Sequence, residues 1–166
     1  NQVILSVAGC SINEIENHIS KFKKKNSLIL MYGFQSEPTK ISDNNILRLK
    51  VLKNNFRNNP IGFMDHTEGI SKYAKFIPFV SASTGISYLE KHITLDYKLK
   101  LEDYVSALSV DRFEEFVKEF KEIEKSLGRD KIIISEKEKI YKNVAAKNVV
   151  LKKNLKKNTK LKKKYE

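Results

Sequence analysis

Four short apolar runs, each followed by a segment with helical spacing, constrain the fold of this 166-residue chain more than any other feature. The runs begin near residues 2, 27, 60 and 86, so a strand-plus-helix unit repeats every 25–33 residues. The first run is almost continuously apolar, which predicts a strand covered on both faces. Such units build parallel sheets with right-handed crossovers. Four units make either a small open sheet or half of an eight-stranded barrel, which needs about 250 residues.

The helices between these strands are predicted from apolar spacing and from residues that favour helix ends. Ser11 and Glu14 have the spacing of a capping box at the start of the first helix. The second helix is expected over residues 42–55, with Ser42 as its N-cap; its apolar positions are Ile46, Leu47, Leu49, Val51 and Leu52. The third is expected over residues 71–82.

The C-terminal part of the chain differs in composition from the rest. The last clear helix begins at the cap Ser109 and can close at Gly128. Beyond it, residues 132–134 are three consecutive isoleucines, which predict a short extra strand or a docking segment. Residues 137–166 hold twelve lysines and two glutamates, so ten of the twelve net positive charges lie there. We therefore divide the chain into an α/β body, residues 1–128, and a lysine-rich, partly ordered linker or tail, residues 129–166.

Composition also narrows the classes of function. Residues 152–164 contain no arginine and no aromatic residue, so a solvated linker is favoured and nucleic acid is disfavoured as a partner. A nucleic-acid-binding module built on the lysines remains the weakest alternative. Cys10 is the only cysteine, which excludes an internal disulfide. No apolar run approaches the ~18 residues of a membrane span. We expect a cytoplasmic protein with no signal peptide and no membrane partner.

Two histidines at strand ends are the best indication of a catalytic site. His66 follows the third strand and His92 ends the fourth, and chemistry in parallel α/β folds collects at the carboxyl ends of strands. Neighbouring strands lie about 4.8 Å apart, so both imidazoles can reach one divalent ion of the Mn²⁺, Zn²⁺ or Fe²⁺ kind. Glu90 is two residues before His92 and points to the same face. The alternatives are satisfied polar residues at strand ends and, for Glu90, a salt bridge to a lysine.

The sequence around these histidines resembles the N-acetylneuraminate (sialic acid) synthase family. The resemblance is carried by residues 60–69, PIGFMDHTEG, and residues 84–96, TGISYLEKHITLD. Residues 3–6, VILS, and residues 31–39, MYGFQSEPT, correspond to two further segments of the family. The resemblance covers roughly residues 2–128 and implies the second half of a (β/α)₈ TIM-type barrel. Residues near 144–148 faintly resemble the linker into the family's C-terminal antifreeze-like domain.

This resemblance implies a reaction and a set of roles. The family condenses phosphoenolpyruvate with an N-acylated mannosamine-type aldose to a nonulosonic acid and releases phosphate. His66 and His92 would be the ligands of a divalent metal, with Mn²⁺ favoured and Mg²⁺ or another ion as alternatives, and Glu90 would be the catalytic acid/base. The residues implied to contact substrate are Ser6, Gln35, Glu37 and Asp103.

The chain also departs from the family pattern. Met64 replaces a serine that would touch phosphoenolpyruvate, Glu37 replaces a tyrosine that would touch the sugar, and Tyr104 replaces a histidine. The family's phosphate-binding lysines and an arginine from a partner's antifreeze-like domain have no counterpart in this sequence. We therefore expect the chain to be inactive alone and to pair with a missing barrel half or a homodimer partner. A diverged metal-dependent barrel aldolase or lyase, or another hydrolase-type barrel enzyme, and a noncatalytic relative remain alternatives.

Overall fold

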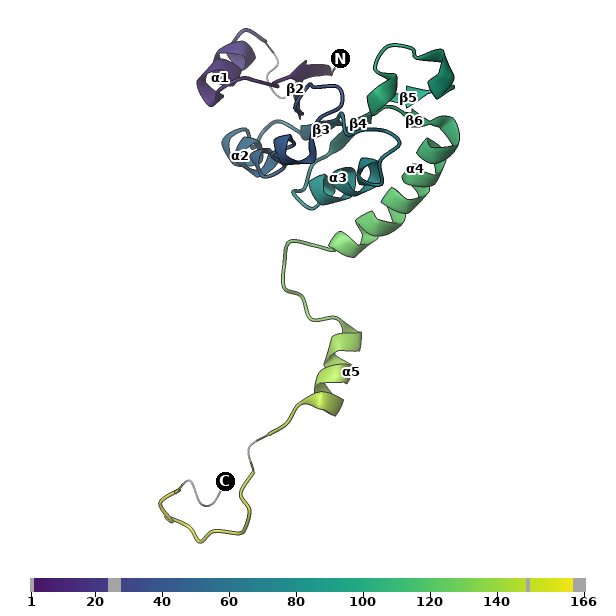
Figure 1. Ribbon diagram of the computed structural model, residues 1–166. Coiled ribbons are helices and arrows are strands. Elements are labelled where there is room, and N and C mark those ends of the chain that lie inside the picture. The colour runs from purple at the N-terminus through teal and green to yellow at the C-terminus, as the bar shows by residue number, and fades with distance from the viewer. Residues whose placement is uncertain (1, 24–27, 149, 163–166) are drawn as a thin grey trace. The chain divides into compact units, whose positions relative to one another are not determined.

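A four-stranded parallel sheet organises the N-terminal part of the chain. The computed structural model describes residues 2–23, 28–148 and 150–162, and its two compact units are residues 1–128 and 129–166. The strands lie side by side in the order in which they occur in the sequence (Figure 1). Their bounds are β1 (Val3–Ser6), β2 (Leu28–Tyr32), β3 (Ile61–Asp65) and β4 (Tyr88–Lys91). An α/β fold of about four βα units is therefore confirmed.

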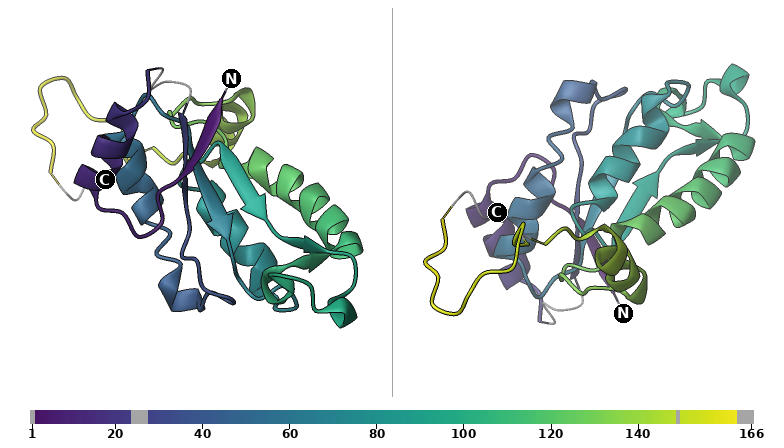
Figure 2. Two further views of the ribbon diagram at one scale, coloured as in Figure 1. Left: turned by 90° about the horizontal axis from the view of Figure 1, so that it is seen from above. Right: turned by 90° about the horizontal axis from the view of Figure 1, so that it is seen from below.

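Helices follow each strand, as the repeat predicts, and can be traced in both views of Figure 2. The four helices of this unit are α1 (Ile12–Ser20), α2 (Arg48–Asn55), α3 (Tyr73–Ala82) and α4 (Val110–Glu124). Two further short strands pair in parallel beside them, β5 (Ile93–Thr94) and β6 (Leu108–Ser109). Single 3₁₀ turns occupy η2 (Ile41–Asp43), η3 (Tyr97–Leu99), η4 (Tyr104–Ser106) and η5 (Lys125–Leu127).

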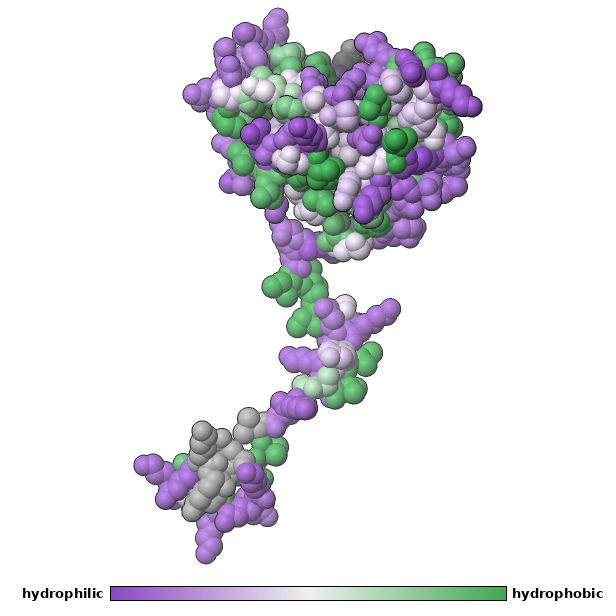
Figure 3. Space-filling view, viewed as in Figure 1, coloured by the Kyte–Doolittle hydropathy of each residue, from purple (hydrophilic) through white to green (hydrophobic). Residues whose placement is uncertain are grey.

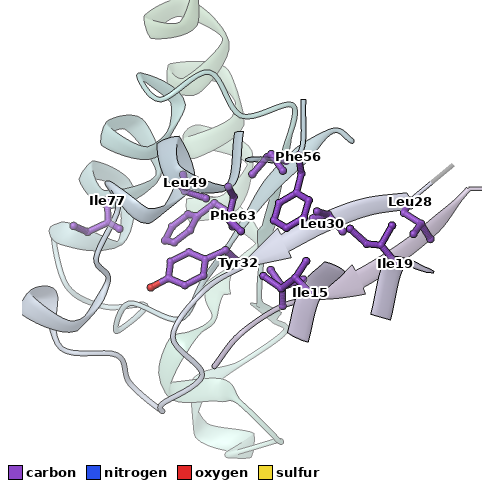
Figure 4. Close-up of a cluster of buried hydrophobic side chains, with 12 residues drawn as sticks. Ile15, Ile19, Leu28, Leu30, Tyr32, Leu49, Phe56, Phe63 and Ile77 are labelled. Carbon is purple, nitrogen blue, oxygen red and sulfur yellow. The ribbon is translucent and has the colours of Figure 1, made fainter. Parts of the chain in front are cut away.

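The helices pack on one face of the sheet and form the main hydrophobic core. Alternate strand residues such as Leu30 and Phe63, both fully buried, meet Ile15 of α1, Leu49 of α2 and Ile77 of α3 (Figure 4). Because side chains alternate across a strand, the intervening residues point to the opposite face. There Ile29, Met31 and Met64 form a second, smaller cluster. This opposite face corresponds to the interior of a barrel.

Both outer strands of the four-stranded sheet are solvent-exposed. Ile4 of β1 is 62% exposed, so the prediction of a strand covered on both faces is wrong for β1. The physical reason is its position at the edge, with only β2 as a hydrogen-bonded neighbour among the described residues. Tyr88 of β4 is also exposed at the other edge. The inner strands β2 and β3, by contrast, are buried along their whole length.

The start of α1 agrees with the prediction from the sequence, whereas α2 agrees only in part. Ser11 and Glu14 form the predicted capping box. The helix predicted over residues 42–55 begins only at Arg48, and Ser42 lies in the turn η2, where its hydroxyl donates to Asp43. Asn45 interrupts the segment with a left-handed backbone, φ 46°. The helix therefore has a shorter buried stripe than the apolar pattern implied.

The longest helix, α4, packs through phenylalanines. Phe116 is almost fully buried, and its ring lies 5.8 Å from that of Phe79 on α3 and 5.6 Å from that of Phe120. Ser109 occupies the predicted N-cap position, but its side chain makes no capping hydrogen bond. Gly128 ends the following turn η5 with φ 63°, which a glycine adopts at little cost.

Residues 129–166 form a separate unit. Its described part contains one helix, α5 (Glu136–Ala145), which the sequence analysis missed although Ser135 and Glu138 form a capping box at its start. The strand expected at residues 132–134 is absent, and these isoleucines are exposed. With no neighbouring strand in this described unit, they have nothing to pair with. Figure 3 shows that hydrophobic residues also reach the surface of the larger unit. None of the described helices is long and apolar enough to cross a membrane.

Candidate active site

The structure brings the two predicted metal ligands together. The register pairs Met64 of β3 with Glu90 of β4, so the residues that follow, His66 and His92, emerge at the same level of the sheet. Their ring centroids lie 4.9 Å apart with an interplanar angle of 61°. This separation allows nitrogen atoms of both rings to approach one ion.

His66 is buried and its backbone is held on both sides. The residue is 7% exposed, and its carbonyl oxygen accepts from the Thr39 amide and from the Ser106 hydroxyl, each at 2.9 Å. Its side-chain Nδ1 is buried and has no hydrogen-bond partner within the described part of the chain. Burial, followed by the positive charge of a protonated His92, lowers the pKa of His66. The neutral ring, which is the metal-binding form, is therefore favoured.

A second group of polar residues surrounds His92. Nδ1 of His92 lies 3.3 Å from a carboxylate oxygen of Asp103, which stands in a left-handed backbone position just before η4. A hydrogen bond with Asp103 raises the pKa of Glu37. The structure thus gathers Glu37, Asp103 and His92, which come from three separate segments, beside His66.

Glu90 lies on the barrel-interior face of β4, as the alternation of side chains requires, and its charge acts on His66. The family resemblance predicts this carboxylate inside an enclosed barrel, where an unpaired charge is costly. In this structure Glu90 is exposed, because β4 is an edge strand and nothing described here covers that face. The Glu90 carboxylate therefore stays hydrated in this unit, and its charge carries no free-energy cost of burial.

Ser6 and Gln35 are not joined to this cluster by any described contact. Ser6 ends β1 and is paired with Met31, three strands away from β4, or about 14 Å at the usual strand spacing. Gln35 is exposed in the loop that follows β2. Both lie at the carboxyl ends of strands, on the same edge of the sheet as the histidines, and their roles remain predictions.

The residues that support the histidines were not predicted from the sequence. Asp65 and Lys91 form a buried ion pair with a separation of 2.6 Å between Lys91 Nζ and Asp65 Oδ2. Their position directly before His66 and His92, in register across two strands, was the available signal. Among the described residues there is no group of three or more histidine, cysteine or acidic side chains arranged to hold a metal ion. Two imidazoles are therefore the basis of any metal site here.

Comparison with known protein families decides the relationship. The family model described as NeuB family matches residues 1–132. The chain belongs to the NeuB family. The resemblance read from residues 60–69 and 84–96 is thereby confirmed.

Individual relatives agree with this assignment. An uncharacterized protein of Methanocaldococcus jannaschii is 33% identical over 93% of this chain and 45% of its own length. The N,N'-diacetyllegionaminic acid synthase of Campylobacter jejuni is 26% identical over 94% of this chain and 46% of its own length. The crystal structure of N-acetylneuraminic acid (sialic acid) synthetase from Leptospira borgpetersenii superposes with a TM-score of 0.75 and 32% identity, over 87% of this chain and 50% of that one.

The chain spans about half the length of the curated relatives that it matches. The structural match likewise covers half of the synthetase chain. The expectation of a partial (β/α)₈ barrel of the synthase type is therefore confirmed. The four βα units described above are that part.

Proposed function

We propose that this chain supplies the metal-binding and acid–base part of a nonulosonic acid synthase, which condenses phosphoenolpyruvate with an N-acylated mannosamine-type aldose and releases phosphate. The observation that carries the proposal is the pairing of His66 with His92 at 4.9 Å, with a buried Nδ1 that has no described partner, in a member of the NeuB family. The names of its relatives, a diacetyllegionaminic acid synthase and a sialic acid synthetase, support this class of reaction.

The residues fit a divalent metal. Two imidazole nitrogens suit a divalent transition metal such as Zn²⁺ or Fe²⁺, and Mn²⁺, which the family resemblance favours, would take oxygen ligands from water and substrate at its other positions. His66 and His92 would hold it, leaving other positions for water and substrate. A bound divalent ion would act as a Lewis acid on the carbonyl oxygen of the aldose. The lowered pKa of His66 keeps its nitrogen free of a competing proton at neutral pH.

Glu90 is the proposed acid/base. When C3 of phosphoenolpyruvate bonds to the carbonyl carbon of the aldose, the carbonyl oxygen becomes a hydroxyl group and requires a proton. Water adds at C2 of phosphoenolpyruvate, and the bond from C2 to the phosphate oxygen breaks, so that phosphate leaves. The carboxyl group of Glu90 lies two residues before His92 on the same face of β4, and can exchange that proton with the substrate. Its exposed position gives substrate direct access from the barrel-interior face.

Asp103 and Glu37 are proposed to bind the sugar. The Asp103 carboxylate lies 3.3 Å from Nδ1 of His92. A sugar bound by this carboxylate would therefore place the sugar's carbonyl carbon near the histidines. Glu37 lies close enough to Asp103 for that residue to raise its pKa, and carboxylates accept hydrogen bonds from sugar hydroxyl groups. Ser6, at the end of β1, and Gln35, in the loop after β2, are proposed to bind phosphoenolpyruvate.

The remainder of the active site is proposed to come from the missing barrel half or from a homodimer partner. Two features of this unit support such a partner. Strands β1 and β4 both leave an open sheet edge, and open edges invite pairing with another chain. A groove of ≈ 530 Å³ beside β4 is lined by Leu89 and by phenylalanines of α4. Cationic groups from that partner would balance the phosphate, so the isolated chain should not turn over.

Phosphate release from phosphoenolpyruvate tests the proposal. The full-length protein containing these residues is incubated with Mn²⁺ and a panel of N-acyl hexosamines. We expect sugar-dependent release that is abolished in His92→Ala, strongly reduced in Glu90→Gln and retained in the control His18→Ala on α1. A folded protein that binds Mn²⁺ but releases no phosphate with any sugar would contradict the proposal and favour a diverged barrel enzyme or a noncatalytic relative.

A further inference from the structure

Asp65 and Lys91 form an ion pair that is shielded from solvent almost completely. Their side chains are 0% and 2% exposed, and the ammonium group lies 2.6 Å from the carboxylate. The two residues are direct partners in the register of β3 and β4. Burying two charges removes their hydration, and apolar residues of similar volume are often at least as stabilising. A contribution to the free energy of folding therefore does not explain why two charged residues, and not two apolar ones, occupy this position.

The pair lies directly behind the two histidines. Because side chains alternate along a strand, Asp65 and Lys91 point toward the helices, whereas His66 and His92 point to the other face. Each charged residue immediately precedes one histidine in the chain. A link between Asp65 and Lys91 is therefore a link between the two strand ends from which the imidazoles emerge.

Asp65 also fixes the backbone around His66. One of its carboxylate oxygens accepts from the Thr67 amide at 2.9 Å and from the Thr67 hydroxyl at 2.6 Å, while the other accepts from Lys91. Lys91 donates in addition to the Thr67 carbonyl oxygen at 3.4 Å. His66 is thus enclosed between two residues that are bound to each other and to the neighbouring strand.

Apart from the side-chain contact of His92 Nδ1 with Asp103 at 3.3 Å, the other described hydrogen bonds of the histidines hold their backbones. The carbonyl oxygen of His66 accepts from Thr39 and Ser106, and that of His92 accepts from the Leu108 amide at 2.9 Å. Arg112, the other cation that acts on Lys91, donates instead to the carbonyl oxygens of Gly69 and Ser71. Among the described residues, Asp65 and Lys91 form the side-chain ion pair that joins the ends of β3 and β4.

We propose that Asp65 and Lys91 are positioning residues that set the spacing and orientation of the His66 and His92 imidazoles, and thereby the affinity of the site for a divalent ion. This inference rests on the proposed function, in which both histidines bind the metal. Residues that orient metal ligands without touching the metal typically change its affinity about 10–100-fold when they are replaced.

The test compares Lys91→Met with Lys75→Met in the full-length protein. Lys75 forms ion pairs with Glu115 and Glu119 at 2.7 and 3.0 Å that join α3 to α4 away from the histidines, so its replacement is a matched loss of a lysine bridge. Titration with Mn²⁺ is followed by electron paramagnetic resonance of the free ion. We expect Lys91→Met to weaken Mn²⁺ binding about 10–100-fold. Lys75→Met should retain the wild-type affinity.

A second measurement does not depend on the metal. In protein with isotope-labelled histidines, the nuclear Overhauser contact between the His66 and His92 rings should be present in the metal-free wild type and in Lys75→Met, and lost in Lys91→Met. If the wild type shows this contact but binds no Mn²⁺, the proposed metal function fails, and the ring contact alone decides the positioning role.

Thr67→Val provides a milder variant should Lys91→Met fail to fold. This substitution removes the Thr67 hydroxyl that donates to Asp65 and leaves the Asp65–Lys91 ion pair in place. We therefore expect a measurable loss of Mn²⁺ affinity or of the contact between the His66 and His92 rings. A folded Lys91→Met that keeps both the wild-type affinity and the ring contact overturns the inference. An unaffected Thr67→Val overturns it if Lys91→Met does not fold.

Discussion

The imidazole rings of His66 and His92 lie edge to face with centroids 4.9 Å apart, although they belong to different strand ends of the sheet. The direct register between β3 and β4 produces this relationship, because it places both residues at the same level on the same face. The Thr39 amide and the Ser106 hydroxyl donate to the His66 carbonyl oxygen, and the Leu108 amide donates to that of His92, so both strand ends are held. The site is thus built by the sheet and by the loops that follow it.

Acid should destabilise the metal-free protein through His66. Its pKa is lowered by burial and by His92, while Asp65 and Glu90 oppose the shift. As pH falls below about 6.5, the unfolded chain binds a proton that folded His66 does not, so stability decreases toward the lowered pKa, by at most about 1.4 kcal/mol per pH unit. Above about pH 6.5 the effect disappears.

Urea unfolding of the metal-free protein at about pH 7.5 and about pH 5.5 measures this effect. We expect His66→Gln to lose less stability on acidification than the wild type, and His18→Gln to keep the wild-type dependence. An identical acid-induced loss in the wild type and in His66→Gln would show that His66 is not the group responsible.

Two neighbouring leucines should differ sharply in their importance. Leu49 of α2 is 1% exposed and lies in the main core, whereas Leu47, at the N-cap of the same helix, is 71% exposed. We expect Leu49→Ala to lower the free energy of unfolding by about 2–5 kcal/mol, because it leaves a cavity. Leu47→Ala should change it by no more than about 0.5 kcal/mol. Equal effects in urea unfolding would argue against the described start of α2.

Ser106 should contribute to stability through His66. Its hydroxyl is buried and donates to the His66 carbonyl oxygen at 2.9 Å, but that oxygen also accepts from Thr39. Because the His66 carbonyl oxygen keeps one donor, Ser106→Ala should lower the free energy of unfolding by only about 1 kcal/mol. This is the lower end of the range of about 1–3 kcal/mol for a buried group that loses its hydrogen-bond partner. Ser83→Ala, which removes an exposed bond within one turn of helix, is the control. A loss no greater than that of Ser83→Ala contradicts this role.

Gly69 should not tolerate a side chain. A Cβ atom there would collide with the backbone of Ala107, and the Gly69 amide donates to Val105 at 2.7 Å. Gly69→Ala should therefore destabilise the protein by about 1–3 kcal/mol, since backbone on both sides must move. It should also weaken Mn²⁺ binding, because the displaced segment carries Ser106. Unchanged stability and unchanged Mn²⁺ affinity would contradict the close approach of these two loops.

The periodic apolar pattern predicted the strands well because each inner strand is buried and has few ways to pack. Helix starts were predictable where a local hydrogen bond determines them, as at Ser11, and not where a backbone irregularity does, as at Asn45. The exposure of Ile4 was not predictable, because an apolar run in the sequence does not show whether the strand lies in the centre or at the edge of the sheet.

The histidines and Glu90 could be placed on one face by alternation alone. The contact between Asp103 and His92 required loop geometry, which single-sequence patterns do not determine. The ion pair of Asp65 with Lys91 depends on the register of two strands, and a shift by one residue would have separated them.

The most direct test of the proposed metal centre is pulsed electron paramagnetic resonance of Mn²⁺ bound to the full-length protein, which detects nitrogen atoms coordinated to the ion. We predict coupling to two imidazoles in the wild type and to one imidazole in each of His66→Ala and His92→Ala. His18→Ala should give the wild-type spectrum. A folded protein whose Mn²⁺ shows no imidazole coupling, or coupling that both substitutions leave unchanged, would contradict the assignment of His66 and His92 as metal ligands.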